Sequence, residues 1–238
     1  MRMSTRIALL AAGLVGSSAF GGLISAKYDI PFNPGNNASF SLYGNNTNVT
    51  AVRINGLRQD TPGFGGADDT IGMSFPSFCV EIGVNIDVST GSVFNGPTLN
   101  AEVYSLGGST TTGGVFFDPT RTDRLERLWG TYFDDTLTNT DATYGAAFQV
   151  AVWKIAFENT VGNLDLFDNA QDMYFSSATA ISNLAQSWLD VINAGGGTSV
   201  ELALIKSADK QDLITVVPAP SALALLGLAG LTARRRRR

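Results

Sequence analysis

The chain has a single cysteine, Cys79, and no histidine among its 238 residues. A chain without histidine cannot form a Ser-His-Asp triad, a Cys-His dyad or a zinc site with histidine ligands, and one cysteine cannot form an internal disulfide. The acidic clusters lack the spacing of an EF-hand calcium loop. We therefore expect no metal and no cofactor, most common enzyme chemistries are excluded, and Cys79 is the residue whose chemistry needs an account.

Cys79 lies in a segment, residues 78–88, in which every even-numbered position is apolar. Because successive side chains of a strand point to opposite faces, this alternation predicts a strand with its even-numbered residues in the core. Cys79 and Glu81 then share the polar face. A structural cysteine is usually a small buried hydrophobe, so this placement favours a chemical role for the thiol.

Four fates of the thiol are compatible with this pattern: a buried inert group, an intermolecular disulfide, a reactive free thiol, or a covalent bond to another side chain. The inert thiol is the simplest of the four. A catalytic thiolate has the least support, because the chain has no histidine to lower the pKa of the thiol.

The elements that must position Cys79 follow from the periodicity of apolar residues. Residues 20–114 are rich in Gly, Asn, Ser and Thr between short alternating runs, which is typical of antiparallel strands joined by turns. Further strands are predicted at residues 200–205 and 211–217. Between these regions, apolar residues recur at helical spacing in three segments. The helical positions are Leu125, Leu128, Trp129 and Tyr132; Phe148, Val152 and Ile155; and Ile181, Leu184, Trp188 and Ile192.

Each predicted helix buries one apolar stripe, and Asp141 and Ser176 occupy the expected N-cap positions of the second and third helices. Three glycines, residues 195–197, end the third helix. Strands, then helices, then strands again predict an α+β fold, with an antiparallel sheet or sandwich and an inserted group of about three helices. We expect this single domain to extend over residues 20–216.

Positive charge is concentrated at the two ends of the chain. Arg2, Arg6 and the five arginines at residues 234–238 are seven of the 16 basic residues, which leaves nine basic against 21 acidic residues in the rest. A body with that acidic excess, a net charge of −12, repels phosphate backbones. We therefore expect no nucleic-acid partner.

Residues 1–19 have the three parts of a secretory signal peptide. A basic start is followed by the apolar run IALLAAGLVG and by small residues just before Phe20. We therefore expect the chain to be exported and to be cleaved by signal peptidase.

The other end of the chain joins a short apolar segment, residues 222–233, to the arginine cluster at residues 234–238. Twelve helical residues reach about 18 Å, which is less than the roughly 30 Å of a bilayer's hydrocarbon core. Arginines hold such an end at the cytoplasmic interface, so we expect a transient anchor in the inner membrane.

Residues 217–238 resemble the bacterial PEP-CTERM sorting signal, which an exosortase reads. The resemblance lies in a Pro-x-Pro motif, a short transmembrane helix and an arginine cluster, although alanine replaces the usual glutamate between the prolines. It implies an exosortase partner and a location at the cell surface, in the outer envelope or in the extracellular matrix of a Gram-negative-type bacterium. The residues concerned include Val217, Pro218, Ala219, Pro220, Arg234 and Arg235.

The body resembles the thioester domains of bacterial surface adhesins in three short motifs. Residues 78–81, FCVE, resemble the aromatic-Cys-hydrophobic-polar motif, and residues 148–153, FQVAVW, resemble the Thr-Gln-x-Ala-hydrophobic-Trp motif. Residues 210–214, KQDLI, approach the hydrophobic-Gln-x-x-hydrophobic motif. Phe148 and Lys210 depart from the threonine and from the first hydrophobic position of these patterns.

This resemblance implies an internal thioester between Cys79 and Gln211, formed with loss of ammonia. Facing residues on adjacent strands have Cβ atoms about 5 Å apart, so neighbouring strands would bring the two groups together. Gln149 and Trp153, four apart on one helix, are expected to hydrogen-bond and shield the bond. Glu81 is expected to transfer a proton while the bond forms.

Two functions follow from these patterns. The first is an exported surface or matrix protein that attaches covalently, through the thioester, to an amine- or hydroxyl-bearing ligand or an exopolysaccharide. The alternative is a non-covalent structural protein of the envelope or exopolysaccharide matrix with a free or buried cysteine. A hydrolase acting through paired carboxylates has no specific residue pair to support it.

Overall fold

The computed structural model describes residues 22–30, 36–59, 74–84, 89–90, 94, 97–139, 141–159, 162–208 and 210–217. The expected signal peptide, residues 1–19, and the expected sorting signal beyond Val217 lie outside the described residues. Within the described ranges, no helix has the length and apolar character needed to cross a membrane.

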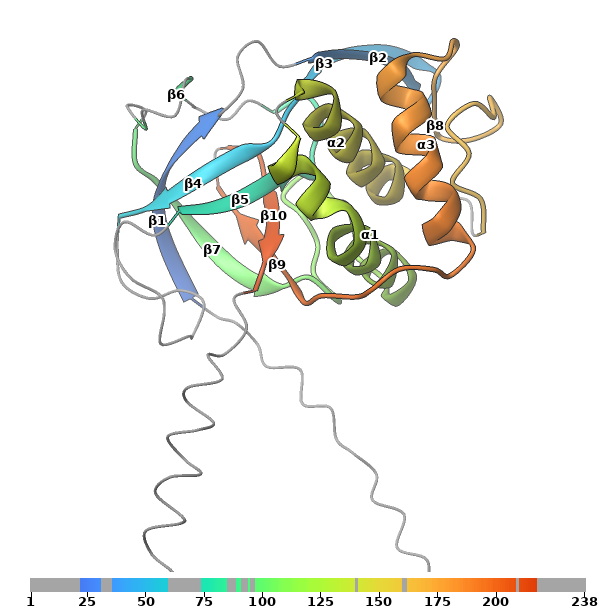
Figure 1. The fold of residues 1–238 in the computed structure, drawn as a ribbon. Helices are drawn as coiled ribbons and strands as arrows, with labels where there is room; N and C mark the ends of the chain where they lie inside the picture. The colour runs from blue at the N-terminus through green and yellow to red at the C-terminus, as the bar shows by residue number, and fades with distance from the viewer. Residues whose placement is uncertain are drawn as a thin grey trace, which may run out of the picture.

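The larger sheet closes on itself into a barrel-like ring of six strands (Figure 1). Strand β1 pairs with both β4 and β7, so the order β1-β4-β5-β10-β9-β7 returns to β1, and all of these pairings are antiparallel. The two-residue strand β6 adds to β1 in parallel. Closure gives each strand of the ring two neighbours, which fixes its register. The strands are β1 (Gly22–Ile30), β4 (Ile54–Arg58), β5 (Ser74–Cys79), β6 (Ser89–Thr90), β7 (Leu99–Ser105), β9 (Leu202–Lys206) and β10 (Leu213–Val216).

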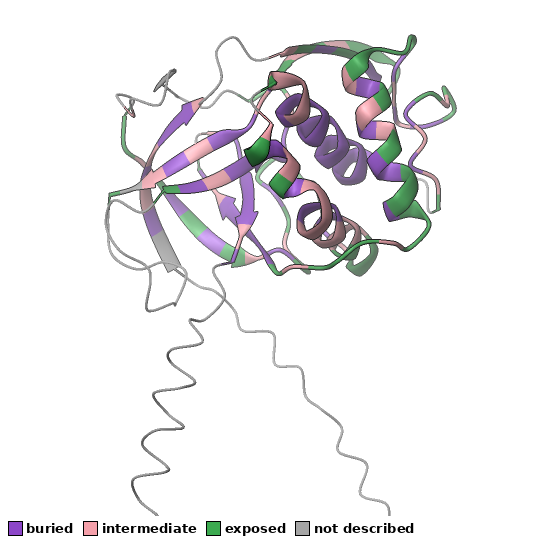
Figure 2. Ribbon diagram, in the orientation of Figure 1, coloured by how far each residue is buried: buried purple, intermediate pink, exposed green. Residues whose placement is uncertain are grey.

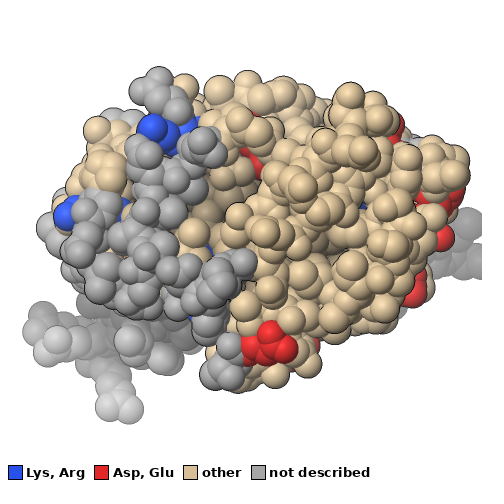
Figure 3. Space-filling view, turned by 90° about the horizontal axis from the view of Figure 1, so that it is seen from above, with Lys and Arg blue, Asp and Glu red and all other residues tan. Residues whose placement is uncertain are grey.

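A second sheet contains β2 (Asn36–Leu42), β3 (Asn45–Ala51) and β8 (Met173–Tyr174), in the order β3-β2-β8. Tyr43 and Gly44 both have positive φ angles, 50° and 79°, so they make the tight two-residue turn that suits a β-hairpin. The sheet lies beside α2, at the top of the view in Figure 1. Seen from above, this side of the molecule carries few charged residues in the part that is described (Figure 3).

Three helices follow β7 and precede β9, as predicted: α1 (Pro119–Thr138), α2 (Ala142–Phe157) and α3 (Ala180–Asn193). Asp141 caps α2 as expected, because its side chain accepts the backbone N–H of Thr143. The prediction of Ser176 as the cap of α3 was wrong. The cap is Thr179, which forms a reciprocal capping box with Ser182, whereas Ser176 lies exposed outside the helix. The α+β prediction is confirmed.

Helix α2 forms the centre of the molecule. It contacts α1 and α3 as well as strands β2, β3 and β5, and every residue from Gly145 to Phe157 is buried (Figure 2). The expectation of a single buried stripe was therefore wrong for this helix, since both sheets and both other helices surround it. Polar side chains on α2 must consequently find partners inside the protein.

Candidate functional site

Cys79 is the last residue of β5, and the strand predicted over residues 78–88 ends there. Residues 77–81 are all buried, with Cys79 only 5% exposed, whereas Val84 is 39% exposed. The predicted alternation was therefore wrong: Cys79 and Glu81 do not share a solvent-facing side, and Val84 is not in the core. The reason is that α2 packs against β5, which leaves this end of the strand covered on both faces. Residues 85–88 of the predicted strand lie outside the described residues.

The structure brings Cys79 together with Gln211, 132 positions later in the chain. Strands β5 and β10 are neighbours, and the register pairs Cys79 with Leu213. Gln211 lies two residues before that partner, and its side-chain Oε1 is 2.9 Å from the Cys79 Sγ. The carboxamide nitrogen of Gln211 donates to the backbone carbonyl of Glu81. Both ends of the amide are thus fixed, with its carbonyl turned toward the sulfur.

Gln149 fixes the main chain of Cys79 rather than its sulfur. Its Oε1 accepts the Cys79 N–H at 2.9 Å, and its Nε2 donates to the Cys79 carbonyl at 2.7 Å. Strand β4 pairs with β5 only as far as Ser77, so the side chain of Gln149 takes the place of a neighbouring strand beyond that point. A carboxamide can do this because it carries a donor and an acceptor side by side.

Glu81 is buried and holds backbone groups of two other segments. Its carboxylate accepts the N–H of Gly113 and, at 3.0 Å, the N–H of Asp212. These contacts tie the residue two positions after Cys79 to the residue directly after Gln211. The expected proton-transfer role of Glu81 stays a prediction, and the contacts observed are those of a positioning group.

Asp212, which the sequence analysis did not identify, holds the residues around Gln211 through its own backbone contacts. Its carboxylate accepts the backbone N–H groups of Thr112 at 2.6 Å and Ser207 at 2.8 Å. Burial raises the pKa of Asp212, the two N–H donors oppose that shift, and the charge of Glu81 adds to it. Its partner Thr112 lies 100 residues earlier, so sequence spacing carried no signal of this contact.

Burial also sets the protonation state of the cysteine. Removal of the thiol from water raises the pKa of Cys79 well above its ordinary value, and the nearby Glu81 carboxylate raises it further. The sulfur is therefore a neutral thiol at pH 7, and it donates its proton to the Gln211 carbonyl. A resident thiolate nucleophile does not fit this environment.

A pocket of about 420 Å³ adjoins the Cys79–Gln211 contact. Trp153, one helical turn after Gln149 on α2, forms part of its wall, packed against Phe40 at a ring-centroid distance of 6.0 Å. Trp153, the expected shielding residue, thus lines the same pocket as Cys79 and Gln211. Its indole Nε1–H is a buried hydrogen-bond donor without a partner among the described residues.

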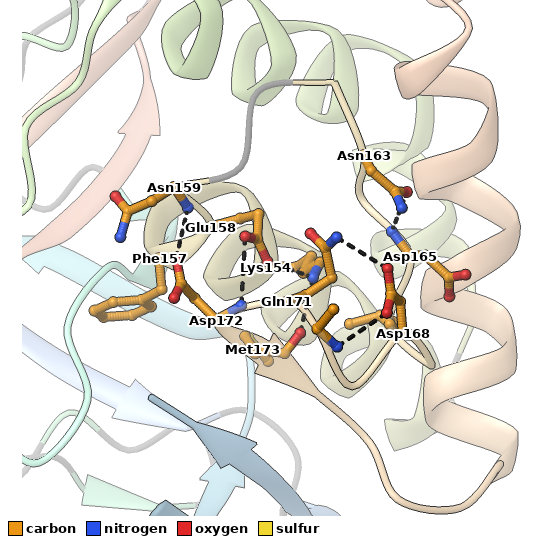
Figure 4. Close-up of polar contacts among 12 residues, drawn as sticks. Lys154, Phe157, Glu158, Asn159, Asn163, Asp165, Asp168, Gln171, Asp172 and Met173 are labelled. Atoms are coloured by element: carbon orange, nitrogen blue, oxygen red, sulfur yellow. Dashed lines mark hydrogen bonds and ion pairs between the residues drawn. The ribbon is translucent and has the colours of Figure 1, made fainter. Parts of the chain in front are cut away.

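A second polar cluster lies at the C-terminal end of α2 (Figure 4). The Lys154 ammonium, fully buried, is 2.6 Å from the Glu158 carboxylate and donates to the Met173 carbonyl at 2.8 Å. Glu158 also accepts the N–H of Asp172. Burial lowers the pKa of Lys154, and Glu158 opposes that shift. The cluster joins α2 to strand β8 and the segment before it.

Two acidic residues in the segment before β8 accept hydrogen bonds from nearby backbone N–H groups. Asp168 accepts the N–H of Ala170 (Figure 4), and Asp165 accepts the N–H of Phe167, each two residues on, as in Asx turns. Within the described ranges, no three His, Cys, Asp or Glu side chains converge in a way that could hold a metal ion.

No protein-family model, no curated protein and no solved structure matches this chain.

Proposed function

We propose that this protein attaches covalently to a partner through an internal thioester between Cys79 and Gln211. The observation that carries the proposal is the 2.9 Å contact between the Cys79 Sγ and the Gln211 Oε1, inside the protein and beside a pocket. Because the two groups are held in contact, their reaction is intramolecular, and its effective molarity relative to the bimolecular reaction can reach the order of 10⁵ M or more.

The reaction balances without a further reagent. The Cys79 sulfur attacks the side-chain carbonyl carbon of Gln211, a C–S bond forms, the C–N bond breaks, and the thiol proton leaves with the nitrogen as ammonia. A nucleophile from a partner, an amine or a hydroxyl, later attacks the same carbon. The C–S bond then breaks, the nucleophile's proton returns to the sulfur, and an amide or ester joins the partner to residue 211.

The surrounding residues favour this chemistry by position. Gln149 holds the Cys79 main chain, and the Glu81 carbonyl orients the Gln211 carboxamide. Gln211 is only 9% exposed, so little water reaches the acyl carbon. Each molecule would react once with a partner, and the protein is then a covalent adhesin and not an enzyme.

We further propose that the protein works outside the inner membrane, at the cell surface, in the outer envelope or in the extracellular matrix. This part of the proposal depends on the sequences of the two ends: signal-peptide character in residues 1–19 and similarity to a PEP-CTERM signal in residues 217–238. Signal peptidase and an exosortase would be its partners during export.

The non-covalent alternative is supported by the protonation state of the thiol. A buried neutral Cys79 that donates to a carbonyl is a stable arrangement in itself, and it would suit a structural protein of the envelope or matrix. The mass of the unfolded protein distinguishes the two functions.

Intact mass spectrometry of the purified protein, unfolded without reductant, tests the proposal. The thioester predicts a mass lower by one ammonia and no titratable thiol, and Cys79→Ala and Gln211→Ala should each have the full mass of their sequence. A full mass with one titratable thiol in the unmodified protein would reject the thioester. If Gln149→Ala lost the bond while Gln211→Ala kept it, the assignment of the two glutamines would be reversed.

A further inference from the structure

A second hollow, of about 360 Å³, lies on the outer face of the β3-β2-β8 sheet. The strand register places Ser41 between Asn46 of β3 and Tyr174 of β8, and it pairs Ser39 with Asn48 in the next row. These five side chains form two cross-strand rows that line the hollow.

The chemistry of this hollow is neutral and rich in hydrogen-bonding groups. Seven of its eight lining residues carry a hydroxyl or amide group, and the eighth is Phe40. Hydroxyl and amide groups both donate and accept hydrogen bonds, which matches the hydroxyl groups of a sugar. Tyr174 adds an aromatic surface for the apolar C–H groups of a sugar ring. A charged ligand would find no counter-charge among the lining residues.

Through Asn48 the hollow adjoins the reactive pocket, which is the pocket of about 420 Å³ beside Cys79 and Gln211. Asn48 lines both cavities, and the next two residues of β3, Val49 and Thr50, continue into the wall of the reactive pocket. Asn48 is exposed and hydrogen-bonds Ser39 across the hairpin. Because β3 is the edge strand of this sheet, an extended ligand in the hollow can cross that edge at Asn48 and reach the pocket lined by Cys79 and Gln211.

We propose that the hollow on β2, β3 and β8 binds a neutral polysaccharide and presents one of its hydroxyl groups to the acyl carbon of residue 211. The binding site stands on its own, whereas the transfer step rests on the proposed thioester. In that step the sugar oxygen bonds to the acyl carbon, the C–S bond breaks, and the hydroxyl proton moves to the Cys79 sulfur. The product is an ester of the polysaccharide and a free thiol.

Binding is tested first without the covalent step, in the Cys79→Ala variant of the full chain. Calorimetric titration with maltohexaose, cellohexaose and mannohexaose should give saturable binding of at least one of them. Asn46→Arg, within the hollow, should weaken that affinity about tenfold or more, whereas Asn45→Arg, exposed on the same strand but not lining the hollow, should change it less than about twofold.

Three results would overturn the proposal. The first is a preference for hexagalacturonate or a lysine-rich peptide over all three neutral sugars. The second is no binding of any sugar, and the third is an equal effect of Asn46→Arg and Asn45→Arg on the affinity. A second readout separates the two proposals. Methylamine incorporation at residue 211 reports the thioester alone, and Asn46→Arg should leave it unchanged. Incorporation without sugar binding would reject the hollow but keep the thioester, and sugar binding without incorporation would reject the thioester but keep the hollow.

Discussion

The thiol of Cys79 donates a hydrogen bond to the very carbonyl that it would attack. This contact holds the sulfur near the acyl carbon, while burial keeps the sulfur protonated and weakly nucleophilic. A slow, single condensation during or after folding suits such an arrangement better than repeated turnover does. The residues around the pair act mainly by position.

The raised pKa of Cys79 predicts how its free thiol reacts. In Gln211→Ala, where no thioester can form, alkylation by iodoacetamide requires the thiolate, and burial disfavours the thiolate in the folded state. In the unfolded chain the thiol has a pKa near 8.5, so its alkylation rate should level off above about pH 9, where the thiol is fully ionised. The alkylation rate of the folded protein should still rise about tenfold per pH unit in that range. A folded-state rate that levels off below pH 8 would contradict the assignment of a buried neutral thiol.

The two hydrogen bonds from Gln149 to the Cys79 main chain give a second prediction. Gln149→Ala leaves the buried N–H and C=O of Cys79 without their side-chain partners, which should lower the free energy of unfolding by about 2–5 kcal/mol. It should also lower the fraction of molecules that have lost ammonia. Urea unfolding and intact mass measure the two effects, and Gln186→Ala on the outer helix α3 is the control, expected to change only stability. Unchanged thioester content in Gln149→Ala would show that the Cys79 main chain needs no such support.

The identities of the site residues could be read from short motifs, but their surroundings could not. Cys79 was predicted as the single cysteine of the chain, and Gln211 and Gln149 from the resemblance to thioester domains; the structure brings the three together. The burial of Glu81 was missed because the apolar alternation of residues 78–88 does not reveal that α2 covers the strand end. The burial of Glu81 depends on tertiary packing, which the local sequence does not show.

Helix α2 carries Gln149, Trp153 and Lys154 within two turns, and Glu158 is its C-cap residue. Its position between both sheets and both other helices explains how one element can line the reactive pocket and also hold strand β8. The three helices were predicted from apolar spacing, but full burial of the second one depends on how the sheets surround it.

Gly130 of α1 is packed so closely that replacing it with alanine should destabilise the protein, whereas Gly→Ala in a helix usually stabilises it. In a free helix, Gly→Ala stabilises by about 1 kcal/mol, but a Cβ at Gly130 of α1 would lie 2.1 Å from the Thr198 carbonyl oxygen. Gly130→Ala should therefore lower the free energy of unfolding by about 1–3 kcal/mol through overpacking. Thermal unfolding measures it, and a stabilised variant would mean that the segment around Thr198 does not pack on α1 as described.

The buried ion pair between Lys154 and Glu158, at the C-terminal end of α2, gives a further prediction. Lys154→Met leaves the Glu158 carboxylate buried without its cation, which should lower the free energy of unfolding by about 3–5 kcal/mol. Lys154→Met combined with Glu158→Gln should recover much of the loss. Arg127→Met, which removes the more exposed pair with Asp123, should cost about 1 kcal/mol or less. Equal losses in urea unfolding for Lys154→Met and Arg127→Met would refute the structural role of this pair.

The closed ring of strands explains how residues so distant in sequence meet. β10 lies between β5 and β9, and the helices occupy the long connection between β7 and β9. The alternation of apolar residues predicted strands and their order in the chain, but not which strands would pair or that β1 would close the ring. Those features depend on long-range pairing, which local patterns do not encode.

The two functions differ in whether a thioester joins Cys79 to Gln211. The most direct test is peptide mapping after the folded protein is treated with methylamine, unfolded and digested. The thioester predicts N-methylglutamine at residue 211 and a newly titratable thiol at Cys79, with neither in Cys79→Ala. An unmodified glutamine at residue 211, together with a thiol at Cys79 that was already free before treatment, would contradict it.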